Sequence, residues 1–460
     1  MDSTAPLAYA QAHQDDFVHE LETLLRIPSV STDPDHADDV QAAADWLAEH
    51  FRALGVADVE VLPTDGHPVV YAAHHPHDDA PTVLVYGHYD VQPPDPLDEW
   101  DHPPFEPTRV NGDLVARGSC DDKGQMLMHV KALEAYLKSD TTPPVNLTFL
   151  IEGEEEIGSQ HLPEVLDTYA DRLDADLVLI SDTSMLAEEQ PTVVYGLRGL
   201  AYLEVTLQGP NRDLHSGLYG GAVENPINAL SQMLADLHDD DHRITIPGFY
   251  DDVRPLTDEE RATIASLPFD EDHWLDEIGL DTARTENGYS ILEAISVRPT
   301  LDVNGIWGGY TGEGAKTVLP AAAHAKVSMR LVPDQAPEAI YDAFEQCLRE
   351  RVPDTMTLTV TRLHGGQPVL VEPDQPIMQA AAAALNTTFD RETVFVRHGG
   401  SIPIIADFQQ RLGLDSVLMG FGLESDAIHS PNEKFGLDRY AKGIETIIQY
   451  YPELAKRLAP

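Results

Sequence analysis

The sequence predicts an α/β fold in which a layered domain is interrupted by an α+β insertion. At 460 residues the chain is longer than one hydrophobic core usually extends, and its hydrophobic content of 42% is enough for packed interiors. Helical apolar patterns alternate with short strands in the first part, which is typical of layered α/β domains. The pattern then changes, and we expect one domain over 1–197 and 371–460 and another over 198–370.

The N-terminal part contains the clearest periodic segments. Apolar residues recur at helical spacing over 7–26 and 40–54, followed by Pro28 and Gly55, which do not continue a helix. A third helical pattern covers 125–137. Short apolar runs typical of buried strands lie at 59–61, 69–72, 82–86, 147–151 and 176–182.

The middle of the chain has a different pattern. Residues 202–207 alternate apolar and polar side chains, as a strand with one solvated face does. We expect a helix over 225–237 and further strands near 325–331 and 356–363. The acidic stretch 239–288 is irregular, with one short helix at most. These features predict an antiparallel sheet covered by helices.

The chain is acidic along its whole length. Asp and Glu total 79 against 29 Lys and Arg, which gives a formal net charge of -50. Because phosphate contacts need a basic surface, this charge argues against nucleic-acid binding and against an anionic membrane surface. An evenly acidic surface stays hydrated in concentrated salt, so we expect a halophilic protein.

Cysteine usage and the N-terminus bear on the cellular compartment. Two cysteines, Cys120 and Cys347, are too few for a disulfide framework. The first residues carry acids where a secretory signal needs an apolar segment, and no apolar run approaches the about 18 residues of a membrane span. We therefore expect a soluble cytoplasmic protein.

Residues 146–159 place a cluster of carboxylates directly after a buried strand. Glu152, Glu154, Glu155 and Glu156 lie there without a Lys or Arg. Like charges at the end of a buried strand repel one another and lose solvation, so a cation should neutralise them, and a metal ion is a candidate. The alternative is a helix start, where glutamates favour the first turn, and this segment alone does not decide between the two.

A second candidate site residue follows the strand at 82–86. His88 and Asp90 are two residues apart on extended chain and so point to the same side. That spacing suits a ligand histidine whose far ring nitrogen is held by a carboxylate. In open α/β sheets such groups collect at the carboxyl ends of the strands.

Three further candidates are Asp121 in a glycine-flanked loop, Asp182 at the end of the strand-like run 176–182, and His429 after the apolar run 416–421. With Glu156 and His88 they give five candidate metal ligands, all of oxygen or nitrogen type. They are His88, Asp121, Glu156, Asp182 and His429. Two imidazoles and three carboxylates can serve two divalent ions if one carboxylate bridges them, and ligands without thiolates fit Zn²⁺, Mn²⁺ or Co²⁺. Two such ions would lower the pKa of a shared water towards about 7, giving a bridging hydroxide, and the uncoordinated Glu155 could take the proton and hand it to a leaving amine.

Several motifs carry a resemblance to a known family. Five segments resemble motifs of the dinuclear-zinc peptidase and aminoacylase family, namely Gly87–Asp90, Arg117–Gly124, Glu154–Ser159, Asp213–Gly217 and His429–Glu433. Two more, Lys316–Pro320 and Gly399–Pro403, are similar to its branch of cytosolic nonspecific and carnosine dipeptidases. The motifs run in the family's order across nearly the whole chain.

The resemblance implies a zinc-exopeptidase-like catalytic domain, with a mixed sheet and helices on both faces, interrupted by a lid through which a homodimer forms. It also implies two divalent ions, most often Zn²⁺. One would be held by His88 and Asp182, the other by Glu156 and His429, with Asp121 bridging, Asp90 orienting His88 and Glu155 as general base and acid.

The resemblance also implies substrate contacts. His215, which otherwise reads as a loop histidine, would reach from the partner's lid and polarise the scissile carbonyl. Arg330, otherwise a surface ion pair, resembles the clamp on the substrate's terminal carboxylate. Thr317, Gly400 and Ser401 match neighbouring contact positions.

The expected activity is therefore metal-dependent hydrolysis of dipeptides or short peptides with a free C-terminal carboxylate. Two positions depart from the branch: His398 stands where it usually has Glu, and the histidine of carnosine dipeptidases is missing around Gln375. An N-acyl-amino-acid deacylase or related amidohydrolase would share the same motifs. A non-catalytic binding relative is a third possibility, although all five ligands and Glu155 are present.

Overall fold

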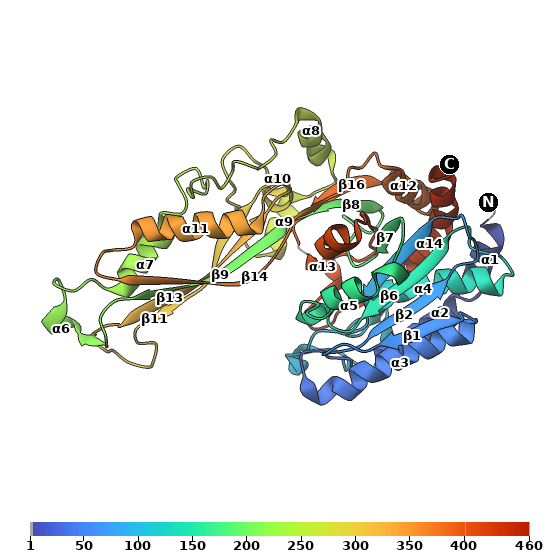
Figure 1. Cartoon of the computed structure of the whole chain (residues 1–460), viewed down its shortest axis with the longest axis horizontal. Coiled ribbons are helices and arrows are strands. Elements are labelled where there is room, and N and C mark those ends of the chain that lie inside the picture. Colours follow the sequence, from blue (N-terminus) through green and yellow to red (C-terminus); the bar gives the residue numbers. More distant parts are fainter. Residues whose placement is uncertain (1–2, 401, 460) are drawn as a thin grey trace. The chain divides into compact units, whose positions relative to one another are not determined.

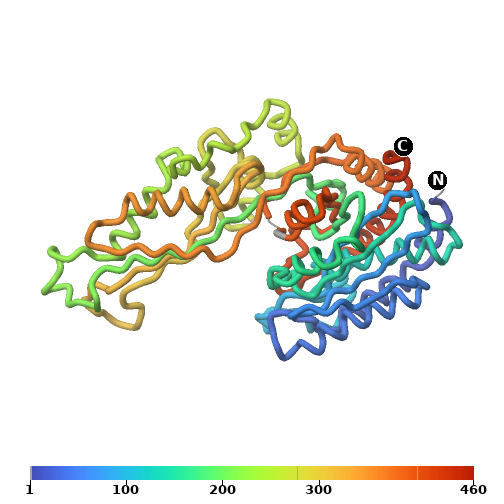
Figure 2. Tube along the Cα trace, in the orientation of Figure 1, coloured from blue at the N-terminus to red at the C-terminus, as the bar shows by residue number. Residues whose placement is uncertain are grey.

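The computed structural model describes residues 3–400 and 402–459, and it divides the chain into two compact units (Figures 1 and 2). The first unit comprises Met1–Tyr195, Val371–Val396 and Asp407–Pro460, and the second comprises Gly196–Leu370 and Arg397–Ala406. In Figure 2 the first unit contains both the blue and the red ends of the chain, so the second unit is an insertion.

The first unit is built on a mixed sheet. Seven of the nine strands described in it follow the order β1-β2-β6-β3-β7-β17-β8, in which β6, β3, β7 and β17 run parallel and the other pairings are antiparallel. Their bounds are β1 Asp58–Leu62, β2 Val69–His74, β3 Thr82–His88, β6 Asn146–Glu152, β7 Leu177–Ile180, β8 Thr192–Leu197 and β17 Ser416–Leu418. The carboxyl ends of the four parallel strands therefore meet at one edge.

Side chains of the central strands alternate between two buried layers. Val83 and Val85 belong to the main core, together with apolar residues of α1, α2, α3, α4, α12 and α14. Tyr86 faces the other side, where its ring lies 5.2 Å from that of Phe408. The predicted α/β class with a mixed sheet is thus confirmed. Among the described residues, no helix is long and apolar enough to cross a bilayer.

The helices and smaller elements of the first unit complete it. The helices are α1 Thr4–Ala12, α2 Gln14–Leu25, α3 Ala37–Leu54, α4 Lys123–Lys138, α5 Leu162–Thr168, α12 Pro376–Phe389 and α14 Leu437–Arg457. Short helical turns are η1 Pro34–His36, η2 Leu97–Glu99, η3 Glu155–Ile157, η4 Ala170–Arg172, η5 Phe408–Leu412 and η6 Glu424–Asp426. A separate three-stranded sheet consists of β4 Thr108–Val110, β5 Asp113–Val115 and β18 Lys434–Gly436.

The second unit contains a four-stranded antiparallel sheet in the order β11-β13-β9-β14. Its strands are β9 Gly199–Gln208, β11 Thr300–Gly308, β13 Ala322–Leu331 and β14 Thr357–Gly366. Alternate residues of β9 and β13 are buried beneath α7 Pro226–Ala235 and α11 Pro337–Arg351. The remaining elements are β10 Leu214–His215, β12 Val318–Leu319, α6 Ser216–Tyr219, α8 Asp258–Ser266, α9 Glu271–Glu277, α10 Ile291–Ser296 and α13 Pro403–Asp407. Two further strands, β15 Val369–Leu370 and β16 Val394–His398, pair with β8 in the mixed sheet described above.

Two sequence-based expectations about helices are wrong. The stretch 239–288 contains two helices, α8 and α9, rather than one at most. Residues 7–26 form two helices that meet at His13 instead of a single one. α8 has no buried residue and therefore no apolar period, but Thr257 and Glu260 form a capping box at its start, and that local signal predicts a helix.

Candidate metal centre

The carboxyl ends of the parallel strands bring predicted ligands together. β3 ends at His88, which lies opposite Glu152 at the end of β6, and β7 ends two residues before Asp182. Glu155 and Glu156 follow β6 in the turn η3. The functional groups therefore lie at the sheet edge where open α/β folds collect them.

Two groups of candidate ligand atoms meet at Asp121. Nε2 of His88 lies 3.1 Å from Oδ1 of Asp121 and 3.8 Å from Oδ2 of Asp182. Nε2 of His429 lies 2.8 Å from Oδ2 of Asp121 and 3.3 Å from Oε2 of Glu156. Within each group the ligand atoms lie within 4.8 Å of one another. Asp121 presents one oxygen to each group, as a carboxylate that bridges two ions does.

Asp90 connects the histidine to the glutamate turn. Nδ1 of His88 lies 3.1 Å from the backbone oxygen of Asp90 and 3.4 Å from Oδ1, so Nε2 remains directed at the ligand carboxylates. The carboxylate of Asp90 accepts hydrogen bonds from the backbone N–H groups of Glu155 (3.2 Å) and Glu156 (3.1 Å). It also accepts one from the hydroxyl of Ser31 at 2.7 Å. One buried carboxylate thus orients a candidate ligand and the turn that carries another.

Negative charge is concentrated at this edge of the sheet. Burial, followed by the nearby Asp121, raises the pKa of Asp182 to about 7, and burial raises the pKa of Glu155 well above its usual value. Hydrogen bonds to Asp121 and Glu156 raise the pKa of His429 to about 10. Burial therefore dominates for the two carboxyl groups, whereas hydrogen bonds to neighbouring carboxylates dominate for His429.

Divalent cations fit this set of residues. Within the described parts of the chain, no lysine or arginine forms an ion pair with the three ligand carboxylates or with Glu155. Two divalent ions would supply the missing positive charge, and oxygen and imidazole donors suit Zn²⁺, Mn²⁺ and Co²⁺.

A second cluster with ligand-type side chains is already neutralised. Glu20, His50 and Glu134 converge in the first unit. The buried ammonium of Lys131 lies among them, in contact with Glu20 and 2.9 Å from both His50 Nε2 and Glu134 Oε2. This cluster therefore differs from the centre at Asp121, where no ammonium is present in the described structure.

The predicted substrate contacts belong to the second unit. His215 is exposed in β10, pairs with Val318 of β12, and accepts a hydrogen bond at Nδ1 from the N–H of Gly217 at 3.0 Å. Thr317 lies beside it, because its carbonyl accepts from the N–H of Ser216 at 3.1 Å. Arg330 is half-buried in β13, and burial lowers the pKa of its guanidinium.

Arg198 holds the loop that contains Gly399 and Gly400, the second of which is a predicted substrate contact. The carbonyl of Gly400 accepts from the backbone N–H of Arg198 at 3.2 Å, and Nε of Arg198 donates to the carbonyl of Gly399 at 2.9 Å. Nδ1 of His398 accepts from the N–H of Gly400 at 3.1 Å. Ser401 lies outside the described residues.

Sequence reasoning assigned no role to two residues that contact the centre. Nε2 of Gln92 donates to Oε2 of Glu156 at 2.8 Å. Glu433 accepts from the backbone N–H of Asp121 at 3.1 Å. Gln92 lies two positions after Asp90, and this spacing is the signal that could have identified it. In the sequence, Glu433 is marked only as the last residue of the motif His429–Glu433.

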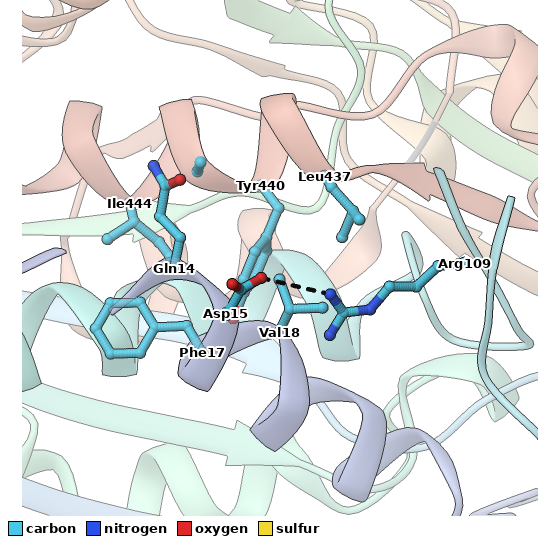
Figure 3. Close-up of a pocket in the computed structure, with 9 residues that line it drawn as sticks. Gln14, Asp15, Phe17, Val18, Arg109, Leu437, Tyr440 and Ile444 are labelled. Atoms are coloured by element: carbon cyan, nitrogen blue, oxygen red, sulfur yellow. Dashed lines mark ion pairs between the residues drawn. The ribbon is translucent and has the colours of Figure 1, made fainter. Parts of the chain in front are cut away.

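A small cavity of about 110 Å³ lies elsewhere in the first unit (Figure 3). Its lining is mostly apolar, with Phe17 and Tyr440 among its walls and an ion pair between Asp15 and Arg109 at 3.5 Å. None of its lining residues belongs to the candidate metal centre. The cavity therefore has no part in the chemistry of that centre.

Comparisons with known proteins bear on this centre. Residues 84–452 match the sequence model described as peptidase family M20/M25/M40. The chain is 34% identical to the Cys-Gly metallodipeptidase dug1 of Schizosaccharomyces pombe, with 96% of each chain covered. It is 32% identical to the Beta-Ala-His dipeptidase of Homo sapiens, with 97% of this chain and 92% of the human protein covered.

Solved structures give a consistent result. The fold is similar to that of the di-peptidase Dug1p from Saccharomyces cerevisiae, with a TM-score of 0.84, 31% identity and 99% of both chains covered. It is also similar to the metallo-carboxypeptidase Sso-CP2 from Sulfolobus solfataricus, with a TM-score of 0.85, 32% identity and coverage of 96% and 99%.

Proposed function

Because this chain belongs to peptidase family M20/M25/M40, which confirms the resemblance drawn from its motifs, we propose that it hydrolyses dipeptides or short peptides with a free C-terminal carboxylate. The observation that carries the proposal is the pair of ligand groups that share Asp121. The relatives named as dipeptidases, which match along nearly the whole chain, support the substrate class.

The proposed centre holds two divalent ions. We propose Zn²⁺ as the metal, with Mn²⁺ or Co²⁺ as alternatives. His88 and Asp182 would bind one ion, Glu156 and His429 the other, and Asp121 both. Such ions supply Lewis acidity towards the scissile carbonyl and acidify a water molecule.

The chain's own residues would move the proton. Glu155 leads the turn that carries Glu156, and its carboxylate accepts no hydrogen bond from the described residues, so it is available to a reacting water. We propose that Glu155 takes the proton from that water and delivers it to the departing amine. Burial favours the protonated form that this delivery requires.

Substrate binding is proposed for the second unit as a lid. Arg330 would bind the terminal carboxylate through its forked guanidinium, and Thr317, Gly400 and Ser401 would line the substrate's path. The partner subunit's His215 would polarise the scissile carbonyl in a homodimer formed through this unit.

Exposed apolar side chains of the second unit support the proposed dimer. β11 is an edge strand of its sheet, and Val303, Ile306 and Trp307 on it are between 42% and 51% exposed. Leu218 at α6 is 78% exposed. Apolar side chains of this size at a sheet edge favour association.

The composition supports a proposed location and environment. The net charge of -50 would keep the surface hydrated at molar salt, and we propose a halophilic enzyme that acts in the cytoplasm. The same acidic surface speaks against nucleic-acid and anionic-membrane partners.

A hydrolysis screen tests the proposed function. The protein, stripped with a chelator and reloaded with Zn²⁺ or Mn²⁺ in molar salt, would be given unblocked dipeptides, tripeptides, and N-acetyl and N-carbamoyl amino acids. We expect fast cleavage of dipeptides, loss of activity in the stripped protein and recovery on reloading. If only the acylated amino acids are cleaved, the substrate class is N-acyl amino acids and not dipeptides. If nothing is cleaved although two metals are bound, the assignment as an enzyme is contradicted.

A further inference from the structure

Glu433 is the last residue of the motif His429–Glu433, and the proposed metal binding uses only the first. Its side chain is fully buried, and its carboxylate accepts four hydrogen bonds. The donors are the backbone N–H groups of Gly118 (2.9 Å), Cys120 (2.9 Å) and Asp121 (3.1 Å) and Nη1 of Arg117 (2.7 Å).

Three of these bonds fix the backbone of the loop that carries Asp121. Amide groups that converge on one carboxylate form charge-assisted hydrogen bonds, which are stronger than neutral ones. The side chain of Asp121 reaches the imidazoles of His88 at 3.1 Å and His429 at 2.8 Å from this backbone position. A shift of the loop would change both distances at once, because both oxygens belong to one carboxylate.

Glu433 also restrains His429, which lies four residues earlier. Four residues of extended chain span at most about 14 Å, so anchoring Glu433 limits where His429 can lie. The backbone takes part as well, since the N–H of Ala116 donates to the carbonyl of Glu433 at 3.0 Å. The side chain of Asn432 binds the backbone of Glu99 (3.0 Å) and Asp101 (2.8 Å), which restrains the same segment on its other side.

We propose that Glu433 is a positioning residue of the metal centre, which holds the bridging aspartate and the segment of His429 at a fixed separation. Both ions would then bind to a preformed set of ligands. The inference rests on the proposed function, because it requires that the centre binds two divalent ions.

A neighbouring buried carboxylate shows why Glu433 is more than a structural ion pair. Asp426 binds Arg439 through two bonds of 2.6 Å and accepts from the N–H of Leu423 at 2.8 Å. Its backbone donor belongs to its own segment, and it contacts the loop of Asp121 only through the thiol of Cys120 at 3.6 Å among the described residues. The three backbone donors of Glu433 belong instead to the loop of Asp121, so Glu433 joins two segments that each supply a proposed ligand.

Zn²⁺ titration of the metal-free full chain by calorimetry tests the inference. In Glu433→Gln the side-chain NH₂ group would replace one carboxylate oxygen, so a hydrogen-bond donor would face the backbone N–H donors of the loop that carries Asp121. We expect both binding steps to weaken by about 10–100-fold, the usual effect of losing a residue that orients metal ligands. The matched control is Glu134→Gln, which removes another buried carboxylate charge paired with a buried ammonium, away from the centre. It should bind two ions with wild-type affinity.

Glu433→Asp covers the case in which Glu433→Gln does not fold. It keeps the charge opposite Arg117 but withdraws the carboxylate by one methylene from the three amides, so zinc affinity should again fall by at least about tenfold. Wild-type affinity in either folded variant would overturn the inference. A wild-type chain that binds neither Zn²⁺ nor Mn²⁺ would contradict the proposed function itself, so the two failures are distinguishable.

Discussion

Glu155 and its neighbour Glu154 differ in their contacts, and this difference gives a test of the proposed base. Glu154 accepts from the N–H of His67 at 3.0 Å and lies 2.8 Å from Nδ1 of His161. The carboxylate of Glu155 has no such partner in the described structure. Glu155→Gln should therefore leave both metals bound and lower turnover by about 10²–10⁴-fold, which is the usual contribution of a general acid–base residue.

Elemental analysis together with steady-state kinetics would check this outcome. Glu154→Gln is the matched control, because it removes an adjacent carboxylate that contacts no proposed ligand, and it should keep most of the turnover. Substantial activity in Glu155→Gln with two metals bound would remove Glu155 as the base.

His129 gives a test of how stability depends on pH. It is fully buried, and burial lowers its pKa to about 3. The hydroxyl of Ser181 donates to the carbonyl of Met419 at 2.8 Å, so it accepts from Nε2 of His129 at 2.9 Å. The folded chain therefore does not protonate His129 between pH 6.5 and 3, whereas the unfolded chain does near about 6.5. The folded chain is therefore stabilised relative to the unfolded chain by keeping His129 neutral. This contribution to the free energy of unfolding is complete above about pH 6.5 and is lost as the pH falls below it.

His129→Gln keeps a donor for Ser181 and removes the titration. We compare the free energy of unfolding of the wild type with that of this variant. The difference between them should fall by about 2 kcal/mol, in disfavour of the wild type, from pH 7 to pH 5, because each pH unit below 6.5 changes it by about 1.4 kcal/mol. Urea unfolding of both proteins across this range measures the difference. Parallel stability curves would show that His129 does not titrate in this way.

At the residue scale, the predictable part of the site was the part that follows strands. His88 and Asp182 stand at strand ends, where buried apolar runs indicate them in the sequence. Glu433 could not be given its contacts in advance, because its partners are backbone amides more than 300 positions away. Backbone donors have no residue-type signature, so only the folded chain reveals such a contact.

At the scale of elements, Lys131 joins three helices. Its buried ammonium in α4 contacts Glu20 of α2, His50 of α3 and Glu134 of α4 itself. Lys131→Met would leave the buried Glu134 without its cation, and we expect a loss of about 3–5 kcal/mol in the free energy of unfolding. Thermal and urea unfolding of the metal-free protein would measure it.

The double variant Lys131→Met with Glu134→Gln separates charge from packing. Removing both charges should recover most of the lost stability, because a neutral pair of similar volume has no uncompensated ion to bury. If the double variant is as unstable as Lys131→Met alone, lost packing rather than the unpaired carboxylate is the cause.

Elements with a strong apolar period were predictable. The predicted helix over 40–54 corresponds to α3, and Gly55 after it has a left-handed φ of 93°. The stretch 239–288 was expected to hold one short helix at most, but it holds α8 and α9. No residue of α8 is buried, so the apolar period that reveals other helices is absent from it. Its start depends on hydrogen bonds between Thr257 and Glu260, which a search for periodicity does not detect.

At the scale of the whole molecule, the change of pattern along the chain predicted an α+β insertion in a layered α/β domain. Contacts divide the chain at Tyr195/Gly196 and Leu370/Val371, and they also assign Arg397–Ala406 to the second unit. That last segment has no change of composition to mark it. Its assignment follows from contacts such as those of Arg198 with Gly399 and Gly400, which join residues about 200 positions apart.

Because the net charge is -50, we expect the proposed dimer to be stable only at high salt. Each subunit carries the same excess of carboxylates, so their mutual repulsion grows when the Debye length rises from about 3 Å at 1 M to about 10 Å at 0.1 M salt. Sedimentation velocity should show a dimer in molar KCl and monomers after dialysis to 0.1 M. Sucrose at matched osmolality, which does not screen charge, should not restore the dimer. A dimer that persists unchanged from 0.1 to 2 M KCl would show that apolar contacts outweigh the repulsion, and the acidic surface would then serve hydration alone.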